Sequence, residues 1–363
     1  METLRTSLHQ RILDSSVHVK VQIRSQKKKN IFSIVDRQNS TRFRESCRIF
    51  YYNESSTGEQ LIMNELYNFF RSNFPYCVRE ESTVRELLIH DKNKTIITHD
   101  SDHKPIAASV SRGNNILFLC VDKVCRGGGI GSYILDRTEE MITSQGFKEI
   151  TIGAGSGYIM PGVPTSRPVI TESLEEAKIC TGIDDSAKRF LEKRGYRHSW
   201  DCNCFDMRLD LDDFNAKPTS QPDVTYRWAT ASDFPAVLTC TNDAHADFTK
   251  YYDTADLYKS WGPQRALIAE TKGEIVGTLI VSFEKEGEGI GSIGCTAVKP
   301  SHRRKGIASN LVVIGTSYLK EAGLKEAFLG YTYSGLDKLY ARAGYKISTY
   351  YFMAKKEIDV EEN

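Results

Sequence analysis

The chain has 363 residues, of which 40% are hydrophobic and 26% charged, and this composition predicts two folded domains that each bury an apolar core. Its 48 basic and 47 acidic residues give a formal net charge of +1, which argues against a generally basic nucleic-acid-binding protein. No apolar run reaches the roughly 18 residues of a membrane helix, and the N-terminus lacks a signal-peptide core, so we expect a cytoplasmic protein without nucleic-acid or membrane partners.

The cysteines indicate a reducing compartment. Nine is an odd number without a regular framework, which is typical of reduced thiols. The closest spacings are Cys202-x-Cys204 and the wider pair Cys120 and Cys125, and no C-x-x-C occurs. We therefore expect no metal site.

The first 44 residues predict a β-hairpin extension. Val17, Val19, Val21 and Ile23 alternate with polar residues, as on a strand with one apolar face. The basic run 27–30 then indicates a turn before a second strand at 31–35.

Strands and helices alternate from residue 45 to 214, which we expect to form the first domain. The expected elements are a strand at 48–52, a helix after an N-cap at 56–57, a hairpin of strands at 94–99 and 105–110, a strand at 115–121, a helix at 132–145, a strand at 149–154, a helix at 185–194 and a strand at 202–211. Residues 215–224 have the composition of a linker, with two prolines among small polar residues.

The same order of elements recurs in residues 225–363, which we expect to form a second domain. Its expected elements are helical segments within 231–260, strands at 266–271, 274–283 and 291–298, a helix at 307–322, a strand at 326–333, a helix at 335–343 and a last strand at 346–355. Two copies of one β/α plan explain both halves.

Each half carries the same glycine motif between an apolar strand and a helix. The first copy reads Val121-Asp-Lys-Val-Cys-Arg126-Gly127-Gly128-Gly129-Ile130-Gly131-Ser132, and the second reads Val298-Lys-Pro-Ser-His-Arg303-Arg304-Lys305-Gly306-Ile307-Ala308-Ser309. Glycine allows close approach of the backbone, and the N–H groups at a helix start attract anions. The pattern predicts a pyrophosphate cradle with added charge from Arg303, Arg304 and Lys305. A plain strand-to-helix turn is the alternative, and recurrence of the motif argues against it.

Other phosphate-binding loops do not fit. A dinucleotide-binding loop requires G-x-G-x-x-G, and a Walker loop ends in G-K-[ST], whereas this motif ends Lys305-Gly306. Both copies match [QR]-x-x-G-x-[GA], and the protein resembles the GCN5-related N-acetyltransferase (GNAT) superfamily over 45–210 and 225–356. The resemblance implies an α/β fold of two tandem GNAT-type mixed-sheet domains after the hairpin extension, with acetyl-CoA as co-substrate and no metal.

The resemblance also implies coenzyme contacts, because the strand before the motif binds pantetheine in this superfamily and the motif amides hold pyrophosphate. In the second copy these contacts are Cys295, Thr296, Ala297, Val298, Arg303, Arg304, Lys305, Gly306, Ile307, Ala308 and Ser309. In the first copy they are the strand from Phe118 to Val121 and then Arg126, Gly127, Gly128, Gly129, Ile130, Gly131 and Ser132. The sequence leaves open whether the first copy binds coenzyme.

A tyrosine distinguishes the two copies. Leu339-Tyr340-Ala-Arg-Ala-Gly344-Tyr345 matches the family pattern in which the tyrosine protonates the departing thiolate of coenzyme A, while Leu191 takes that position in the first copy. We therefore expect the C-terminal domain to be catalytic, with Tyr340 as general acid; a core aromatic is the alternative for this residue. The asparagine that often precedes the tyrosine by seven residues is replaced by Tyr333, which we place among the substrate contacts.

The first copy contains an insertion. Its glycine- and proline-rich sequence at 155–168 predicts a shaped loop, and with the second half it resembles the glucosaminide N-acetyltransferases of bacteria and fungi. A surface loop without function is the alternative.

Acceptor residues are expected on the first helix of the second domain. Asp243 and Asp247 are four residues apart, so we expect them on one helix face, where they would hold an aminium group, with Tyr251 and Tyr252 stacking on a sugar ring. A solvated charged face is the alternative for the aspartates, and His245 is expected at the surface. Strand 291–298 has no carboxylate base, which favours an amine of low pKa over lysine.

Together these features predict an N-acetyltransferase that uses acetyl-CoA on a primary amine, with glucosamine or glucosamine-containing oligosaccharides as the preferred acceptor. Two alternatives stay open: a protein or histone lysine acetyltransferase, and a non-catalytic sensor of acetyl-CoA or sugar. The sequence is compatible with a homodimer and does not determine the oligomeric state.

Overall fold

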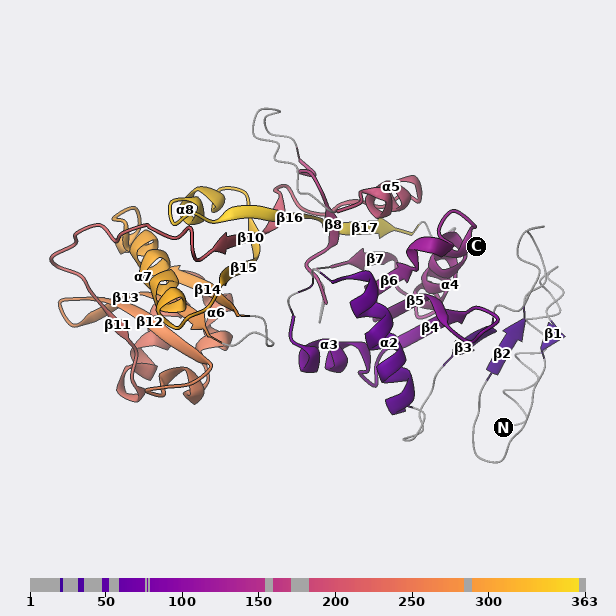
Figure 1. The fold of residues 1–363 in the computed structure, drawn as a ribbon, viewed down its shortest axis with the longest axis horizontal. Helices are drawn as coiled ribbons and strands as arrows, with labels where there is room; N and C mark the ends of the chain where they lie inside the picture. Colours follow the sequence, from indigo (N-terminus) through magenta and orange to yellow (C-terminus); the bar gives the residue numbers. More distant parts are fainter. Residues whose placement is uncertain are drawn as a thin grey trace. The chain divides into compact units, whose positions relative to one another are not determined.

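The computed structural model describes residues 20–21, 32–35, 48–51, 59–75, 77, 79–153, 159–170, 183–283 and 289–358. It consists of two compact units, each built on one mixed sheet (Figure 1). Unit 1 comprises Met1–Gly162, Gly195–Arg197 and Met353–Asn363, and unit 2 comprises Val163–Arg194 and His198–Phe352. The predicted class, two tandem mixed-sheet α/β domains, is confirmed.

Over the described residues, the sheet of unit 1 has nine strands in the order β1-β2-β3-β4-β5-β6-β7-β17-β9. The strands are β1 Lys20–Val21, β2 Phe32–Val35, β3 Arg48–Tyr51, β4 Lys94–His99, β5 Pro105–Arg112, β6 Asn115–Val121, β7 Glu149–Ile152, β9 Arg197–His198 and β17 Ala354–Glu357. β1 and β2 pair antiparallel as the expected hairpin, whose turn lies outside the described residues. β6 and β7 run parallel.

Helices cover both faces of this sheet. α2 (Glu59–Asn73) and α3 (Glu81–Leu88) pack on one face, and α4 (Ile130–Thr143) packs on the other (Figure 1). Neighbouring residues of a strand point to opposite faces, so Ile97 joins the α2 side and Ile96 the α4 side. A short 3-10 turn, η1 (Lys123–Cys125), connects β6 to the first motif.

The sheet of unit 2 has eight strands in the described part of the chain, in the order β11-β12-β13-β14-β15-β10-β16-β8. The strands are β8 Val163–Thr165, β10 Cys204–Asp210, β11 Thr225–Trp228, β12 Gln264–Thr271, β13 Glu274–Ser282, β14 Ile290–Val298, β15 Glu326–Tyr333 and β16 Lys346–Phe352. β14 and β15 run parallel, as β6 and β7 do in unit 1.

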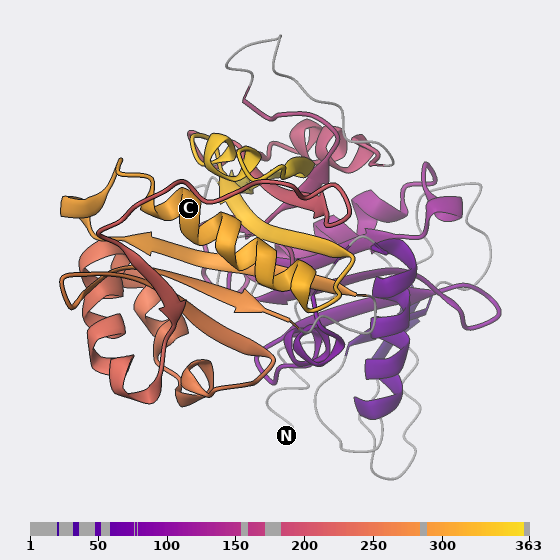
Figure 2. The ribbon, with the colours of Figure 1, turned by 60° about the vertical axis from the view of Figure 1, so that its left-hand side comes forward.

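Two long helices cover this second sheet. α7 (Ile307–Glu321) crosses one face (Figure 2), where Leu311 and Val312 pack on Leu279 and Val281. α6 (Phe234–Tyr252) packs on the other. The remaining helical elements are α5 Ser186–Lys193, α8 Asp337–Ala341, and the 3-10 turns η3 Ala231–Asp233, η4 Ala255–Tyr258 and η5 Pro300–His302.

The sequence order and the spatial units differ at two strands. β10 precedes the second repeat in sequence, yet it lies between β15 and β16 in unit 2. The last strand, expected to be continuous over 346–355, is instead interrupted at Met353, so that β16 belongs to unit 2 while β17 pairs with β7 in unit 1. Each repeat therefore contributes a strand to the sheet formed mainly by the other repeat: β10 to the sheet of unit 2, and β17 to the sheet of unit 1.

This exchange predicts which fragments fold. A fragment of residues 225–363 lacks β10, so β15 and β16 lose the strand between them, and we expect it to be unfolded or aggregated. A fragment of residues 163–352 contains the whole of unit 2 and is expected to unfold cooperatively. Circular dichroism during thermal unfolding of both fragments tests this, and a cooperative transition in 225–363 would contradict the exchange.

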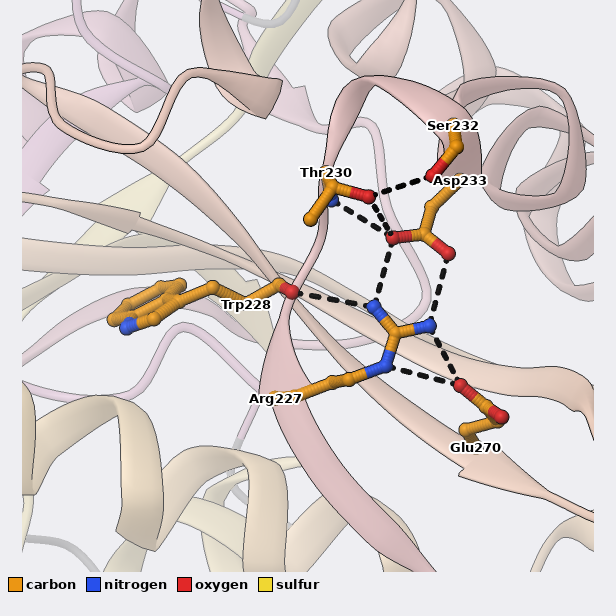
Figure 3. A network of polar contacts seen from close by, with 6 residues as sticks. All are labelled: Arg227, Trp228, Thr230, Ser232, Asp233 and Glu270. Atoms are coloured by element: carbon orange, nitrogen blue, oxygen red, sulfur yellow. Dashed lines mark hydrogen bonds and ion pairs between the residues drawn. The ribbon is translucent and has the colours of Figure 1, made fainter.

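An ion-pair network fixes the start of α6 (Figure 3). Arg227 donates to both oxygens of Asp233, at 2.7 and 2.9 Å, and to Glu270 on β12. Asp233 also accepts the N–H of Thr230 at 2.8 Å, completing a capping box with that residue. These bonds, led by the one from Arg227, hold the pKa of Asp233 well below its usual range.

We expect Asp233→Asn to destabilise unit 2 by about 1 kcal/mol, because asparagine can still cap the helix but loses the ion pair with Arg227, and thus to lower its melting temperature by about 2–4 °C. A depressed carboxyl pKa stabilises the fold above the unfolded pKa of about 3.9 and loses that contribution as pH falls toward the folded value. The difference from wild type should therefore persist from pH 7 to pH 5 and shrink below about pH 4. Thermal unfolding across this range measures it, and a difference that grows at low pH would contradict the assignment.

Candidate active site

β14 and β15 part after a short paired stretch. They are in register only at Ile290–Glu326, Gly291–Ala327 and Ser292–Phe328 among the described pairs. Beyond this point, β14 has a bulge opposite β13, between the pairs Thr278–Ala297 and Ile280–Gly294. Cys295 lies in this bulge with a φ of 50°, which is unusual for a residue other than glycine. The bulge turns backbone groups of β14 out of the ladder where the two strands separate.

A buried tyrosine fixes the bulge. The Tyr252 hydroxyl donates to the carbonyl of Cys295 at 2.8 Å, and the carbonyl of Tyr252 accepts from the Tyr258 hydroxyl at 2.9 Å. The Tyr252 side chain is 0% exposed. A ring without exposed surface cannot stack on an acceptor, so the expected role of Tyr252 in substrate binding does not fit the structure. Its position instead makes it a support of β14.

The motif arginines hold the loop together. Arg303 Nε donates to the carbonyl of Val298 at 3.0 Å, and Arg126 Nε makes the equivalent bond to Val121 at 3.0 Å. Arg303 Nη2 also donates to the carbonyl of Ala244 in α6, at 2.8 Å. These bonds engage the Arg303 guanidinium with backbone and make it a structural anchor of the motif loop, while its expected contact with phosphate stays a prediction.

The two motif loops have the same backbone form. Gly306 and Gly129 occupy the N-caps of α7 and α4 with φ of 83° and 91°, and the positions two residues earlier, Arg304 and Gly127, are also left-handed. The first helical bonds run from Asn310 N–H to Gly306 and from Tyr133 N–H to Gly129. The amides of the first turn of α7 thus point out of the helix start, with Arg304 and Lys305 exposed beside them.

The expected linker contacts the second cradle. Gln221 Nε2 donates to the carbonyl of Lys305 at 2.5 Å, and Asn310, which is buried in α7, exchanges hydrogen bonds with the backbone of Thr219. The linker composition gave no signal of this contact, because it depends on side chains meeting over a long sequence separation.

Tyr340 lies at the separation of β14 and β15. Its side chain is 5% exposed, and burial raises the pKa of Tyr340, opposed by the nearby Thr296 hydroxyl and reinforced by Cys295 and Tyr333. The Thr296 hydroxyl is itself buried and makes no hydrogen bond of ordinary geometry within the described residues. The structure therefore brings together Tyr340, Tyr333, Cys295 and Thr296, four residues expected at the site.

The expected pair of aspartates is separated by a break in α6. His245 has non-helical φ and ψ of −163° and 93°, so Asp243 and Asp247 do not share one face of a continuous helix. Asp243 forms an ion pair with Lys299 at 3.4 Å, and Asp247 is exposed. Tyr251 is exposed beside Lys250, whose Nζ lies 5.0 Å from its ring. The side chain that the break exposes, His245, stacks on Phe248.

The first repeat differs from the second at the corresponding positions. Leu191, which belongs to unit 2, is buried and stands where the second repeat has Tyr340, and Phe118 of unit 1 stands where the second repeat has Cys295. The register of β5 and β6 is continuous from Ala107–Val121 to Val110–Phe118, so the bulge does not fall at Phe118. The Phe118 ring packs against Phe70 and Phe74 of the core. The first repeat thus keeps the motif loop, but it has leucine in place of the tyrosine, and the bulge of β6 falls at Leu117, between the pairs Val110–Phe118 and Ser111–Ile116.

The described residues contain no group of three or more His, Cys, Asp or Glu side chains that could hold a metal ion. No helix in that part of the chain combines the length and apolarity of a membrane crossing.

Comparison with known proteins assigns this fold. The acetyltransferase (GNAT) family model matches residues 227–345. A GCN5-related glucosamine N-acetyltransferase region of a fungal multi-domain GH3 β-N-acetylglucosaminidase is 17% identical with a TM-score of 0.63; the match covers 88% of this chain and 39% of that one. The present chain thus spans well under half of that protein.

Two further solved structures align over nearly their whole length. A GCN5-related N-acetyltransferase from Sphaerobacter thermophilus is 18% identical with a TM-score of 0.59, covering 86% of this chain and 96% of that one. A tandem GNAT protein from the clavulanic acid biosynthesis pathway is 12% identical with a TM-score of 0.62, and the match covers 86% of this chain and 100% of that one. The search of curated proteins found no match. Residues 227–345 therefore match the acetyltransferase (GNAT) family, and the chain as a whole has the fold of the tandem GNAT proteins.

Proposed function

We propose that unit 2 transfers the acetyl group of acetyl-CoA to a primary amine, with glucosamine or a glucosamine-containing oligosaccharide as acceptor. The observation that carries this proposal is the position of the Tyr340 hydroxyl, next to Thr296 and where β14 separates from β15. GNAT enzymes use acetyl-CoA, so the site must receive a thioester at one end and a pyrophosphate at the other.

The residues of unit 2 fit acetyl-CoA. The separated strands and the bulge at Cys295 offer backbone groups to an extended pantetheine arm, and the Thr296 hydroxyl is a buried polar atom that lacks a partner of ordinary geometry within the described residues. The start of α7 offers amides to the pyrophosphate, with Arg304 and Lys305 alongside. These donors therefore suit a ligand that joins an anionic pyrophosphate to a neutral pantetheine arm.

The proposed reaction is direct transfer. The neutral amine attacks the thioester carbonyl, a C–N bond forms, and backbone N–H groups of the bulge stabilise the oxyanion. The C–S bond then breaks, Tyr340 gives its proton to the departing thiolate, and the amine loses its extra proton to solvent. The raised pKa of Tyr340 keeps its hydroxyl protonated throughout the neutral range, so the donor is ready before each turnover.

Two features support glucosamine over lysine. β14 contributes no carboxylate that would deprotonate an amine with a pKa near 10.4, so an amine that is partly neutral at pH 7 suits the site better. The similarity to the glucosamine N-acetyltransferase region points the same way.

The test is thiol release from acetyl-CoA by the full-length protein with glucosamine, free lysine and a lysine-containing peptide. We expect the largest kcat/KM for glucosamine. A larger value for the peptide would favour a protein acetyltransferase, and acetyl-CoA binding without release for any amine would favour a sensor.

A direct mechanism also makes a prediction for Cys295. Burial raises the pKa of this thiol to about 11, so it is neutral at pH 7 and a poor nucleophile. We expect Cys295→Ala to keep turnover within about threefold of wild type, and initial rates to show sequential kinetics. Ping-pong kinetics that disappear in Cys295→Ala would instead establish an acetyl-cysteine intermediate.

A further inference from the structure

Three aromatic side chains form a surface beside Tyr340. The Trp200 ring lies 5.8 Å from the ring of Tyr331 and 6.3 Å from that of Tyr333, between ring centroids. Tyr331 and Tyr333 are 37% and 40% exposed, and both belong to the end of β15. We call Trp200, Tyr331 and Tyr333 the aromatic platform.

The platform is continuous with the proposed general acid. The carbonyl of Tyr333 accepts the N–H of Leu336, and the carbonyl of Leu336 accepts the N–H of Tyr340, so two consecutive turns connect Tyr333 to Tyr340. The two side chains also interact electrostatically, because Tyr333 contributes to the raised pKa of Tyr340. A ligand on the platform would therefore lie next to the reacting end of the site.

The backbone under the platform is held in an unusual conformation. Tyr331 has a φ of 57°, a left-handed conformation that disfavours bulky residues. The carboxylate of Asp206 on β10 stabilises it, accepting the N–H of Tyr331 at 2.8 Å and the hydroxyl of Tyr351 at 2.6 Å. Such strain is maintained where the surrounding structure imposes it, and here it keeps an aromatic ring at the surface.

The chain directly after the loop inserted in the first repeat also supports the aromatic platform. Asn203, which is buried, accepts the N–H groups of Val169 and Ile170 at 2.8 and 2.9 Å and donates to the Ile170 carbonyl at 2.7 Å. The backbone of Asn203 is bonded in turn to Ser334, directly after Tyr333. The residues that directly follow the loop are thus fixed beside the platform, which gives this segment a structural role.

We infer that the aromatic platform binds the pyranose ring of the acceptor, with Trp200 as a specificity-determining residue. This rests on the proposed function. A sugar ring presents C–H groups on its faces, which pack on exposed aromatic rings, while a linear amine offers no such face. Trp200 precedes β10 and therefore comes from the first repeat, so the strand exchange would let that repeat select the substrate of the second.

Steady-state kinetics of the full-length protein test this inference. We expect Trp200→Ala to raise KM for glucosamine about tenfold, with Trp200→Phe restoring most of the loss. KM for a linear primary amine and the Kd of acetyl-CoA should stay within twofold of wild type. Trp261→Ala is the matched control, because Trp261 is an exposed tryptophan of the same unit (82%). This variant should change the KM for neither glucosamine nor the linear amine.

Fluorescence provides a second measurement. The chain has three tryptophans, so glucosamine should alter the emission of the wild type and of Trp261→Phe but not of Trp200→Phe. An unchanged KM for glucosamine in folded Trp200→Ala, or a retained response in Trp200→Phe, would overturn the inference while leaving the proposed function intact. Equal losses for glucosamine and the linear amine would show cation binding in place of ring binding. Absence of amine-dependent thiol release in the wild type would instead refute the proposed function.

Discussion

Tyr340→Phe is expected to lower kcat about 100-fold, at the lower end of the contribution of general acid catalysis. A thiol has a pKa near 8.5, so the departing thiolate is a fair leaving group, and a phenol with a raised pKa is a weak acid toward it. Both facts limit the decrease in kcat that removal of the hydroxyl can cause. Because only one hydroxyl is removed from a buried ring, the Kd of acetyl-CoA should change less than threefold. Single-turnover thiol release and calorimetric titration on the same preparation measure the two quantities.

The matched control is Tyr345→Phe. Tyr345 is also buried and its ring lies 6.3 Å from that of Tyr340, but its hydroxyl bonds to Thr316 of α7 at 3.0 Å. Loss of that bond should lower stability by about 1 kcal/mol and leave kcat near wild type. Near-normal turnover in Tyr340→Phe would refute the general-acid assignment.

Gly306→Asp is expected to weaken acetyl-CoA binding about 100-fold relative to Gly306→Asn. Both side chains impose the same shape at a residue with a φ of 83°, and both meet Gln221, whose Nε2 would lie 2.8 Å from an added Cβ. The two variants therefore share the strain, and only aspartate adds a negative charge at the proposed pyrophosphate cradle. Two charges about 5 Å apart at an effective dielectric constant of about 20 repel by about 3 kcal/mol, which corresponds to this ratio. Calorimetric titration with acetyl-CoA measures it.

The same pair of changes at Gly129 addresses unit 1. Space around Gly129 is open, with no heavy atom of the described residues within 4 Å of an added Cβ, and its φ of 91° matches that of Gly306. If only unit 2 holds coenzyme, Gly129→Asp and Gly129→Asn should bind acetyl-CoA equally. If aspartate weakened acetyl-CoA binding relative to asparagine at Gly129 but not at Gly306, the coenzyme site and the proposed chemistry would have to be assigned to unit 1.

Local sequence signals predicted the elements well because they depend on neighbouring residues. The strand expected at 326–333 is β15, and the helix expected at 307–322 is α7, within one residue. The short strands β8, β9 and β11 were missed, since two to four residues carry too little periodicity. The helix expected around Asp243 exists, but its break at His245 was missed, and the carbonyl of Ala244 beside that break accepts from Arg303, which is distant in sequence.

The sequence by itself determined the repeat, the two glycine cradles and the asymmetry between Tyr340 and Leu191, because each of these is a pattern of residue types at fixed spacing. Only the tertiary structure decided which strands complete each sheet, that Tyr252 supports the Cys295 bulge from within the core, and that Trp200 meets Tyr331 and Tyr333. The physical reason is that strand pairing and side-chain packing join segments far apart in the chain. Several pairings can satisfy one apolar pattern, and the free energy of the whole packed core selects among them.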